Sequence, residues 1–314
     1  MKRPSEPCGT ADFVGRGTAR APGTCGELAQ GHLHGTAVMV TCPIDIGSKA
    51  IVEVSDGSGS VCGPADAPKA RQAVASTLDI LGRPELNARL KLQSALPRSK
   101  GMASSTADVS AAIAATAAAL DATLSPQQQA ELAVAIEPSD GVMLPGIALF
   151  DHLGGRIART LGPPPPMRVL VLEFSDEVDT EAFNAGSRAN GVYQDDSRFR
   201  EALELIAAGL ANGDPRQIGE GATLSSQLNQ CILPKPRLPH AMKLAKEAGA
   251  LGVNVAHSGT VIGLLFEADA ERIAWAALSA RQRLPEIVAI HDCRMIGGGA
   301  VVHPGTQRTV ATTA

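Results

Sequence analysis

Aromatic side chains are scarce in this sequence. They make up 3% of the 314 residues, with one Trp and one Tyr. Proteins that bind single-stranded nucleic acid stack bases on aromatic rings, so this scarcity argues against that class. The net charge is −4 and there is no long basic run, which also argues against a nucleic-acid partner. Any anion that the chain binds must therefore be held by local geometry rather than by overall charge.

Paired cysteines and long apolar runs are missing as well. The cysteines form no C-x-x-C pair, and with the scattered histidines they show no zinc spacing. The close pair His32 and His34 is more typical of a solvated loop. The N-terminal region lacks an apolar signal core, and no run approaches the ~18 apolar residues of a membrane helix. We therefore expect a cytoplasmic protein with reduced cysteines and no membrane partner. The cysteines are Cys8, Cys25, Cys42, Cys62, Cys231 and Cys293.

Several familiar catalytic motifs are absent too. The sequence has no G-x-x-x-x-G-K-[ST], no G-x-G-x-x-G between strand and helix, no H-E-x-x-H, no G-x-S-x-G and no protein-kinase signature. A P-loop protein is thereby excluded. What is present is ample material for a core, since 44% of the residues are hydrophobic and 19% are charged. The length suggests about two domains at ~150 residues each.

The most informative stretch is residues 97–108, Pro-Arg-Ser-Lys-Gly-Met-Ala-Ser-Ser-Thr-Ala-Asp. Alternation over 86–92 predicts a strand before it, and the alanine-rich run 107–122 predicts a helix after it. A basic, hydroxyl-rich loop that opens a helix suits an anion, because free N–H groups and the helix dipole face the loop. Simple helix capping, with Ser105 and Asp108 as a capping box, explains this stretch equally well.

Periodicity predicts the remaining elements. Residues 18–31 are expected to form a strand end followed by a turn, and the four prolines at 163–166 mark the best domain boundary. The second half alternates strands and helices, which favours a small α+β sandwich. Further strands are expected over 37–41, 50–55, 147–150, 156–160, 167–174, 253–257, 261–266, 286–291 and 294–302, and helices over 69–81, 125–136, 198–212, 215–231, 239–249 and 269–283.

Three segments, 22–27, 97–107 and 256–263, together resemble the GHMP kinase superfamily, the kinases of galactose, homoserine, mevalonate and phosphomevalonate. The resemblance runs from about residue 18 to 303. It implies an α+β, two-domain GHMP-kinase-like fold. An ATP-binding domain with the phosphate loop would span 18–162, and a ferredoxin-like domain would span 163–305. The family's central motif, P-x-x-x-G-[LM]-x-S-S-x-A, is matched by Pro97, Gly101, Met102, Ser104, Ser105 and Ala107.

Within the family, residues 23–31, 41–45 and 137–140 are most similar to the L-threonine kinases of cobalamin synthesis and propanediol utilisation. This likeness implies that ATP phosphorylates the hydroxyl of L-threonine, giving O-phospho-L-threonine and ADP for the aminopropanol side chain of cobalamin. Two alternatives stay open. One is homoserine kinase or another small-molecule kinase of the family. The other is a non-catalytic ligand-binding regulator, against which the retained acidic and hydroxyl residues argue. A homodimer is also left open.

The resemblance implies a role for each candidate residue. Mg²⁺ would be held by Ser105 and Glu137, and Asp140 would accept the proton of the substrate hydroxyl or only position it. Lys100 would add a point charge to catalysis, and the loop 56–68 would contribute to the adenine pocket. The substrate would contact Arg20, Cys25, Glu27, Asp140 and Ser258, with Arg20 and Glu27 as candidates for its carboxylate and ammonium groups. The ATP phosphates would contact Pro97, Ser99, Lys100, Gly101, Met102, Ala103, Ser104, Ser105 and Thr106.

Taken singly, these segments have simpler explanations. Residues 137–140 read as a helix end followed by an Asx-type turn, residues 258–260 as a tight turn, and Glu27 as a solvated loop residue. The chain also departs from the family pattern at Ala103, where glycine is usual. We expect the Cβ of Ala103 to narrow the approach of the backbone to a phosphate.

Overall fold

The computed structural model describes residues 12–175, 197–231, 233–256 and 259–303. The strands are β1 (Phe13–Leu33), β2 (Thr36–Ser55), β3 (Val61–Cys62), β4 (Asn87–Ser94), β5 (Ile147–Phe150), β6 (Ala158–Gly162), β7 (Met167–Phe174), β8 (Gly252–Val255), β9 (Ile262–Glu267), β10 (Ile287–Arg294) and β11 (Val301–Val302). The helices are α1 (Pro68–Ile80), α2 (Ser104–Ala119), α3 (Pro126–Ile136), η1 (Gly141–Met143), α5 (Ser197–Asn212), α6 (Pro215–Leu228), η2 (Asn229–Cys231), α7 (Leu238–Ala248) and α8 (Ile273–Arg283).

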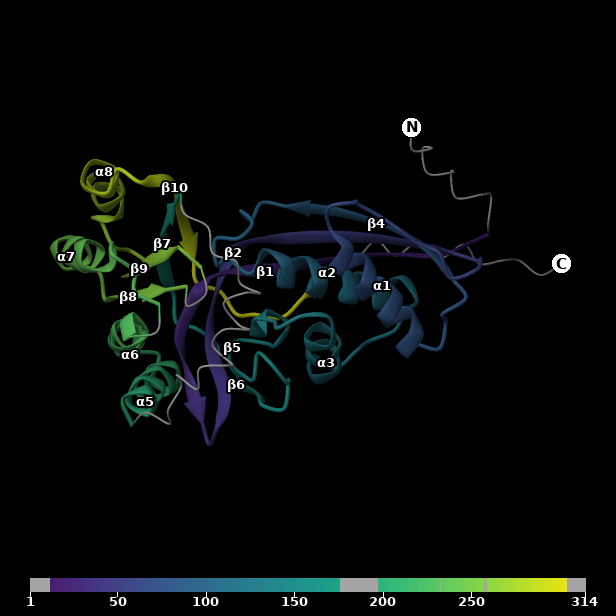
Figure 1. The fold of residues 1–314 in the computed structure, drawn as a ribbon, viewed down its shortest axis with the longest axis horizontal. Helices are drawn as coiled ribbons and strands as arrows, with labels where there is room; N and C mark the ends of the chain where they lie inside the picture. Colours follow the sequence, from purple (N-terminus) through teal and green to yellow (C-terminus); the bar gives the residue numbers. More distant parts are fainter. Residues whose placement is uncertain (1–11, 176–196, 232, 257–258, 304–314) are drawn as a thin grey trace.

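The described strands form one 11-stranded sheet that runs the length of an elongated molecule (Figure 1). Its order is β10-β7-β9-β8-β1-β2-β4-β3, with β11 and β5 added at β1 and β2, and β6 at β5. Helices α1–α3 gather at one end, and α5–α8 at the other. The predicted α+β class is confirmed. No helix among the described residues is both long enough and apolar enough to span a membrane.

Strands β1 and β2 connect the two ends of the molecule. They are 21 and 20 residues long and pair along almost their whole length. The expected turn within 18–31 is therefore wrong, and so is the division of β2 into strands at 37–41 and 50–55. The glycines and proline that suggested a turn instead produce register shifts between Pro22 and Gly23 and on both sides of Glu27. Such bulges let a strand bend without ending.

Helix α2 lies at the centre of the first core. It is buried on nearly all sides, as an alanine-rich helix without a polar face must be. Strand β1 can approach it closely because residue 17 is a glycine. A Cβ at Gly17 would lie 2.0 Å from the carbonyl oxygen of Ala115. The predicted helix is confirmed, but the capping box is wrong. Ala103 is the N-cap residue, and the side chains of Ser105 and Asp108 bond to Glu137 and Ser48 instead.

Helix α3 begins as its sequence predicts. Ser125 accepts from the N–H of Gln128, the side chain of Gln128 accepts from the N–H of Ser125, and Pro126 occupies the first turn. The helix ends at Ile136, so that Glu137 adopts an extended conformation at its C-cap. This local capping fixes where the acidic segment 137–140 leaves the helix.

Three groups of buried side chains make up the core. The first lies between α1–α3 and the sheet, and the third between α7, α8 and strands β7–β9. The second contains residues from both sides of the proline run, for example Leu28 of β1 together with Val169 of β7 and Phe199 of α5. Because this group spans the run at 163–166, the domain boundary there stays a prediction.

The final predicted strand, 294–302, is wrong as a single element. Strand β10 continues to Arg294, and only the two residues of β11 follow, paired with Ala19 and Arg20 of β1. The N–H groups of the intervening glycines bond instead to the segment between α3 and β5. Gly298 and Gly299 donate to the carbonyl oxygens of Gly146 and Val142, at 2.8 Å each.

Candidate active site

The three segments that the sequence singled out meet at the loop 97–103, which connects β4 to α2. The N–H groups of Thr24 and Gly26 on β1 donate to the carbonyl oxygens of Met102 and Gly101, at 3.1 Å each. From the other side, the N–H groups of Thr260 and Val261 donate to the carbonyl oxygen of Lys100 at 3.0 and 3.2 Å. The loop is therefore clamped between β1 and the turn before β9.

The loop owes its tight path to unusual backbone angles. Residues Ser99, Gly101 and Ala103 have φ values of +59°, +81° and +54°. A Cβ at Gly259 would lie 2.4 Å from the Cα of Gly101, so the two glycines allow the loop and the turn to touch. Ala103 shows why glycine is favoured at its position. Its left-handed conformation is strained for any residue with a Cβ.

The N-terminus of α2 opens onto this loop. The first N–H to bond within the helix is that of Ala107, to the oxygen of Ala103. The N–H groups of residues 104–106 precede that bond, and N–H groups at such a position, together with the helix dipole, favour a negative charge. Lys100, which is 8% exposed, donates from Nζ to the oxygen of Ser175 at 3.1 Å. The loop thus carries a positive charge of its own, held at the end of β7.

Ser105 and Glu137 form the first pair of candidate ligands. The Ser105 hydroxyl donates to Oε1 of Glu137. The second carboxylate oxygen of Glu137 accepts from Nζ of Lys69, on α1, at 2.6 Å. Sequence reasoning placed Ser105 and Glu137 together, but it missed Lys69, which reads simply as a solvated lysine in the first turn of a helix.

Thr106 and Asp140 form a second pair beside the first. The Thr106 hydroxyl lies 3.4 Å from Oδ2 of Asp140 and accepts from the Asp140 N–H, also at 3.4 Å. Burial raises the pKa of Asp140 to about 7, and the negative charges of Glu27 and Glu137 add to the increase. The Thr106 hydroxyl acts in the opposite direction. A carboxyl group with this pKa can accept a proton near neutral pH.

Glu27 lies within electrostatic reach of both Asp140 and a lysine that sequence reasoning missed. It is 4% exposed, so it is not a solvated loop residue. Lys235, between Pro234 and Pro236, is 9% exposed and donates from Nζ to the oxygen of Gly259 at 2.6 Å. Burial lowers the pKa of Lys235 to about 8, while the charge of Glu27 opposes the decrease. No sequence motif marks this lysine.

Two of the predicted substrate residues, Arg20 and Cys25, are not brought to this place. Arg20 lies between Ala19 and Ala21, which pack in the core beneath α2, so its side chain points to the opposite face of the sheet. Cys25 is fully buried, with its Sγ 3.8 Å from Oδ1 of Asn254, and burial raises its thiol pKa well above the usual value. The structure does not support a substrate contact for either. Ser258 lies outside the described residues.

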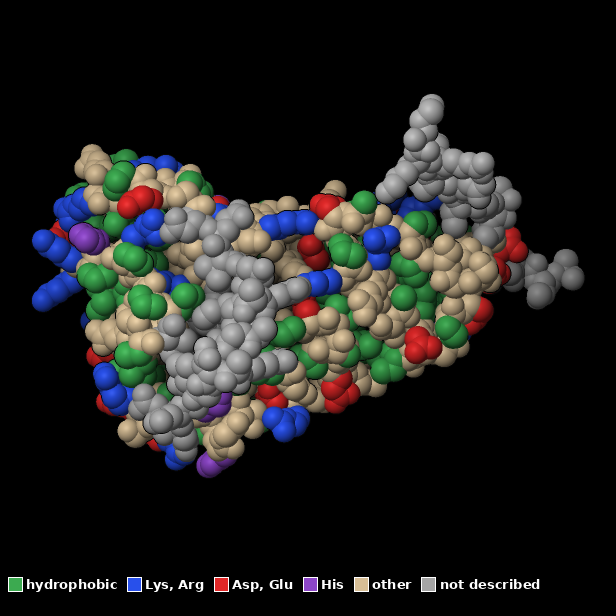
Figure 2. Space-filling view, viewed as in Figure 1, with side chains coloured by type: hydrophobic (Ala, Val, Ile, Leu, Met, Phe, Trp, Pro, Cys, Tyr) green, Lys and Arg blue, Asp and Glu red, His purple; other side chains and the backbone are tan. Residues whose placement is uncertain are grey.

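The loop 56–68, expected near the adenine, is tied to the phosphate loop by Arg98. Its guanidinium donates to the backbone oxygen and the carboxylate of Asp66, at 2.8 and 2.9 Å. This contact places the two loops side by side, while the adenine assignment stays a prediction. In the view of Figure 2, basic and acidic side chains lie close together over the middle of the molecule, and further basic side chains gather at its left end.

Both halves of the chain match models of known protein families. The family model described as GHMP kinases N terminal domain matches residues 68–148, and the model described as GHMP kinases C terminal matches residues 202–282. The first match includes the phosphate loop, Glu137 and Asp140. The second includes Lys235 and the turn before β9.

Individual proteins are similar over most of the chain. An L-threonine kinase from Salmonella typhimurium is 34% identical over 82% of this chain and 85% of its own length. An L-threonine kinase from Citrobacter freundii is 33% identical over 90% of this chain and 98% of its own length. A homoserine kinase from Moorella thermoacetica is 26% identical over 81% of this chain and 88% of its own length.

Solved structures share the fold at lower identity. A homoserine kinase from Cytophaga hutchinsonii superposes with a TM-score of 0.68 at 18% identity, covering 96% of this chain and 100% of that one. A mevalonate kinase from L. major gives a TM-score of 0.64 at 16% identity, covering 95% and 99%. These structures support the two-domain architecture of the fold.

Proposed function

We propose that this chain, which belongs to the GHMP kinase family, uses ATP to phosphorylate the hydroxyl group of L-threonine. The products would be O-phospho-L-threonine and ADP, in support of the aminopropanol side chain of cobalamin. The observation that carries the proposal is the position of Asp140. It lies beside the first turn of α2 and within the fields of Glu27 and Glu137. A proton acceptor, an anion site and a buried acid thus converge on one place.

The phosphate donor would be bound by the loop 97–106. The N–H groups of the first turn of α2 would hold phosphate oxygens, and Lys100 would neutralise part of their charge. Phosphoryl transfer depends on positioning and charge neutralisation more than on covalent work by the protein. The clamped backbone of this loop, with its glycine contact at Gly101 and Gly259, suits that demand because it fixes the donors before the ligand arrives.

The residues present also fit Mg²⁺. This ion prefers oxygen ligands and usually takes one or two carboxylates together with substrate phosphates and water. The hydroxyl of Ser105 and the carboxylate of Glu137 are such oxygens, and they already touch. When bound, the ion would neutralise charge on the phosphates. Lys69 would hold the second oxygen of Glu137 and so orient the carboxylate.

Asp140 would take the proton of the substrate hydroxyl as the phosphoryl group is transferred. Its pKa of about 7 allows it to be ionised in a useful fraction of molecules and still basic enough to accept a proton. The Thr106 hydroxyl would keep the carboxylate oriented toward the N-terminus of α2. If Asp140 only positions the hydroxyl, the same contacts would serve that role.

An amino-acid substrate needs one acidic and one basic partner. Glu27 would accept from its ammonium group, and Lys235 would donate to its carboxylate. Both side chains are almost fully buried, so a charged ligand would meet them away from competing water. Lys235 thereby replaces Arg20 in the role that the sequence suggested, since Arg20 faces the other side of the sheet.

Homoserine kinase is the alternative within the family, because homoserine is an isomer of threonine and a homoserine kinase is among the similar proteins. The two substrates differ in the position of the hydroxyl, which only the shape of the pocket can discriminate. A non-catalytic regulator is the alternative of another class, and retention of Ser105, Glu137 and Asp140 argues against it.

A substrate panel tests the proposal. ADP release would be measured with Mg·ATP and, in turn, L-threonine, L-serine, L-homoserine, mevalonate and galactose. We expect the highest kcat/KM with L-threonine. A preference for homoserine would support the alternative kinase, and no turnover with any compound would support the regulator.

A further inference from the structure

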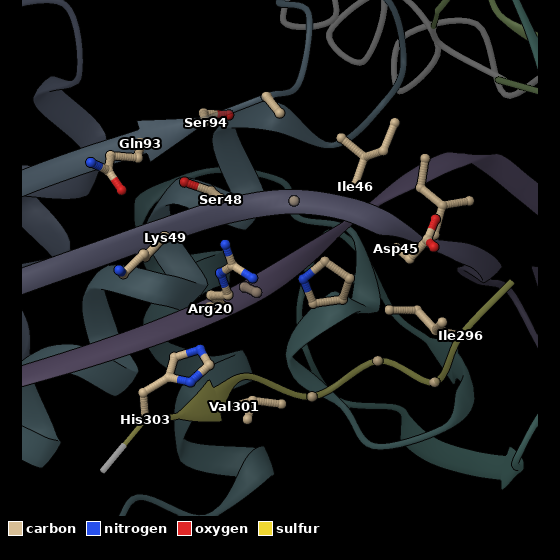
Figure 3. Close-up of a pocket in the computed structure, with 18 residues that line it drawn as sticks. Arg20, Asp45, Ile46, Ser48, Lys49, Gln93, Ser94, Ile296, Val301 and His303 are labelled. Atoms are coloured by element: carbon tan, nitrogen blue, oxygen red, sulfur yellow. The ribbon is translucent and has the colours of Figure 1, made fainter. Parts of the chain in front are cut away.

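The face of the sheet turned away from α2, here called the outer face, carries a hollow of about 710 Å³ (Figure 3). This volume is typical of small-molecule sites, which span ~300–1,000 Å³. Its floor is a row of three side chains, Arg20 of β1, Lys49 of β2 and Gln93 of β4, which are neighbours in the register of the sheet. One wall is the glycine segment 297–299 between β10 and β11.

The hollow is separate from the candidate active site. Side chains alternate between the faces of a strand, and the neighbours of Arg20 on β1, Ala19 and Ala21, pack in the core beneath α2. The sheet itself therefore lies between Arg20 and the N-terminal turn of α2. The glycine wall is fixed from behind, because Gly298 and Gly299 bond to the segment that contains η1.

The floor of the hollow has an unbalanced positive charge. Arg20 and Lys49 are directly opposite each other in the β1–β2 pair, an arrangement that is unfavourable for like charges. Among the residues that the structure describes, neither has an ion-pair partner. Asp45 also lines the hollow, but it is paired with Arg294 at 2.8 Å and lies at the other end (Figure 3).

A second pair of cations on the same face shows the contrast. Arg16 and Lys91 lie further along β1 and β4, and both approach Oε1 of Glu53, at 3.9 and 3.7 Å. The sequence thus supplies a carboxylate for the cations outside the hollow and none for the two on its floor. The missing negative charge is what a ligand would provide.

Other groups of the hollow fit a ligand with a polar head and an apolar body. The ring of His303 points toward Arg20 (Figure 3), and its Nε2 is buried without a hydrogen-bond partner among the described residues. The amide of Gln93 is a further donor at the floor. Ile46 and Ile296 supply apolar surface at the opposite end.

We propose that this hollow binds a small organic phosphate, with the phosphate group between Arg20 and Lys49 and the organic part against Ile46 and Ile296. A phosphate monoester carries about −1.5 to −2 charges at neutral pH, which matches two cations. The fork of an arginine and the point charge of a lysine are the usual partners of such a group. Binding would also remove the repulsion across the β1–β2 pair.

Calorimetric titration with glycerol 3-phosphate and with inorganic phosphate tests this site. The double variant Arg20→Gln/Lys49→Met is compared with wild type and with the matched control Arg16→Gln/Lys91→Met. The control removes two cations that are paired with Glu53 in wild type. We expect wild type and control to bind glycerol 3-phosphate equally, and the first variant to bind at least tenfold more weakly. Any binding at the N-terminus of α2 would be the same in all three proteins. Only a difference in affinity between the two double variants therefore assigns the ligand to the hollow.

A second readout is the melting temperature. Without ligand, the Arg20/Lys49 variant should melt no lower than wild type, because a repulsion has been removed. At ~10 mM glycerol 3-phosphate, wild type and control should gain stability by mass action and this variant should not. Equal affinity in the two double variants, or no binding to wild type, would overturn the proposal. A further titration with n-butyl phosphate tests the apolar end: wild type should bind it more tightly than glycerol 3-phosphate, and equal affinity for these two esters would overturn the role of Ile46 and Ile296.

Discussion

Ser105 donates its hydroxyl hydrogen to the carboxylate of Glu137, 32 residues later in the chain. The contact joins the first turn of α2 to the end of α3, and it uses the serine that could otherwise cap its own helix. Lys69 completes the arrangement from α1 by holding the other carboxylate oxygen. Three helices therefore fix one carboxylate beside the phosphate loop.

Replacing Glu137 by Gln should lower kcat at least ~10²-fold, the cost of losing one preorganised charge-stabilising group. The amide can still accept from Ser105, so the helices should stay together. Steady-state kinetics at several Mg²⁺ concentrations, with circular dichroism, would measure both effects. Glu131→Gln on the exposed face of α3 is the matched control and should leave kcat unchanged. Equal activity of the two variants would disprove the metal assignment of Glu137.

The proton accepted by Asp140 should appear in the pH profile. Because kcat/KM reports the free enzyme, in which the pKa of Asp140 is about 7, it should rise about tenfold per pH unit below that value and level off above it. Asp140→Asn should lower kcat roughly 10²–10⁴-fold and abolish this limb. A profile of wild type that stays flat from acid to alkaline pH would rule out Asp140 as the base.

The same carboxyl group should make stability depend on pH. Its pKa is raised from 3.8 to about 7 in the folded chain, so between these values the native state holds the proton more tightly than the unfolded state. The free energy of unfolding therefore loses a contribution as pH rises through this window. Urea denaturation at both ends of the window should show that Asp140→Asn is relatively more stable at the higher pH. An identical pH dependence in wild type and variant would contradict this.

Lys235→Met should raise KM for the amino acid about tenfold or more, with a smaller effect on KM for ATP, because a charged contact to the carboxylate is lost. As the pKa of Lys235 is about 8, KM of wild type should also rise above that pH. Lys243→Met, on the exposed side of α7, is the control and should behave like wild type. If both variants keep the wild-type KM, Lys235 does not bind the substrate.

Ala103→Gly should increase the free energy of unfolding by about 1 kcal/mol, since glycine adopts a positive φ without the strain of a Cβ. Ala103 has φ +54° at the N-cap of α2, whereas Ala67 has φ −124° at the N-cap of α1. Ala67→Gly is therefore the matched control and should give no gain. Urea denaturation of both variants measures the difference, and an equal change in the two would show that backbone strain is not the cause.

Local patterns predicted much of the fold. The strand β4, the alanine-rich α2 and the capped α3 follow from alternation, helix propensity and capping chemistry, which act between near neighbours. The expected helix at 269–283 starts a little later, at Ile273, and that at 215–231 ends earlier, at Leu228. Boundaries of this kind depend on which backbone groups find partners in the tertiary structure.

Bulges in β1 explain why the sequence predicted a turn where the strand continues. A register shift can change which face the following side chains occupy, and β1 has two such shifts between Arg20 and Glu27. The sequence predicted a turn within residues 18–31 rather than a continuous strand, so it gave no basis for assigning these two residues to faces of one sheet. It also could not show that Lys69 and Lys235 approach the acidic residues, because both come from elements distant in the chain.

The sequence by itself determined the family, and it predicted a phosphate site in the loop 97–106 and the pairing of Ser105 with Glu137, because these rest on a motif at fixed spacing and on the resemblance that the motif carries. Only the tertiary structure decided the partners of those residues, the raised pKa of Asp140 and the placement of Arg20 in the hollow of the outer face. Burial and electrostatic fields arise from groups far apart in sequence, and the face that a side chain occupies depends on every bulge before it.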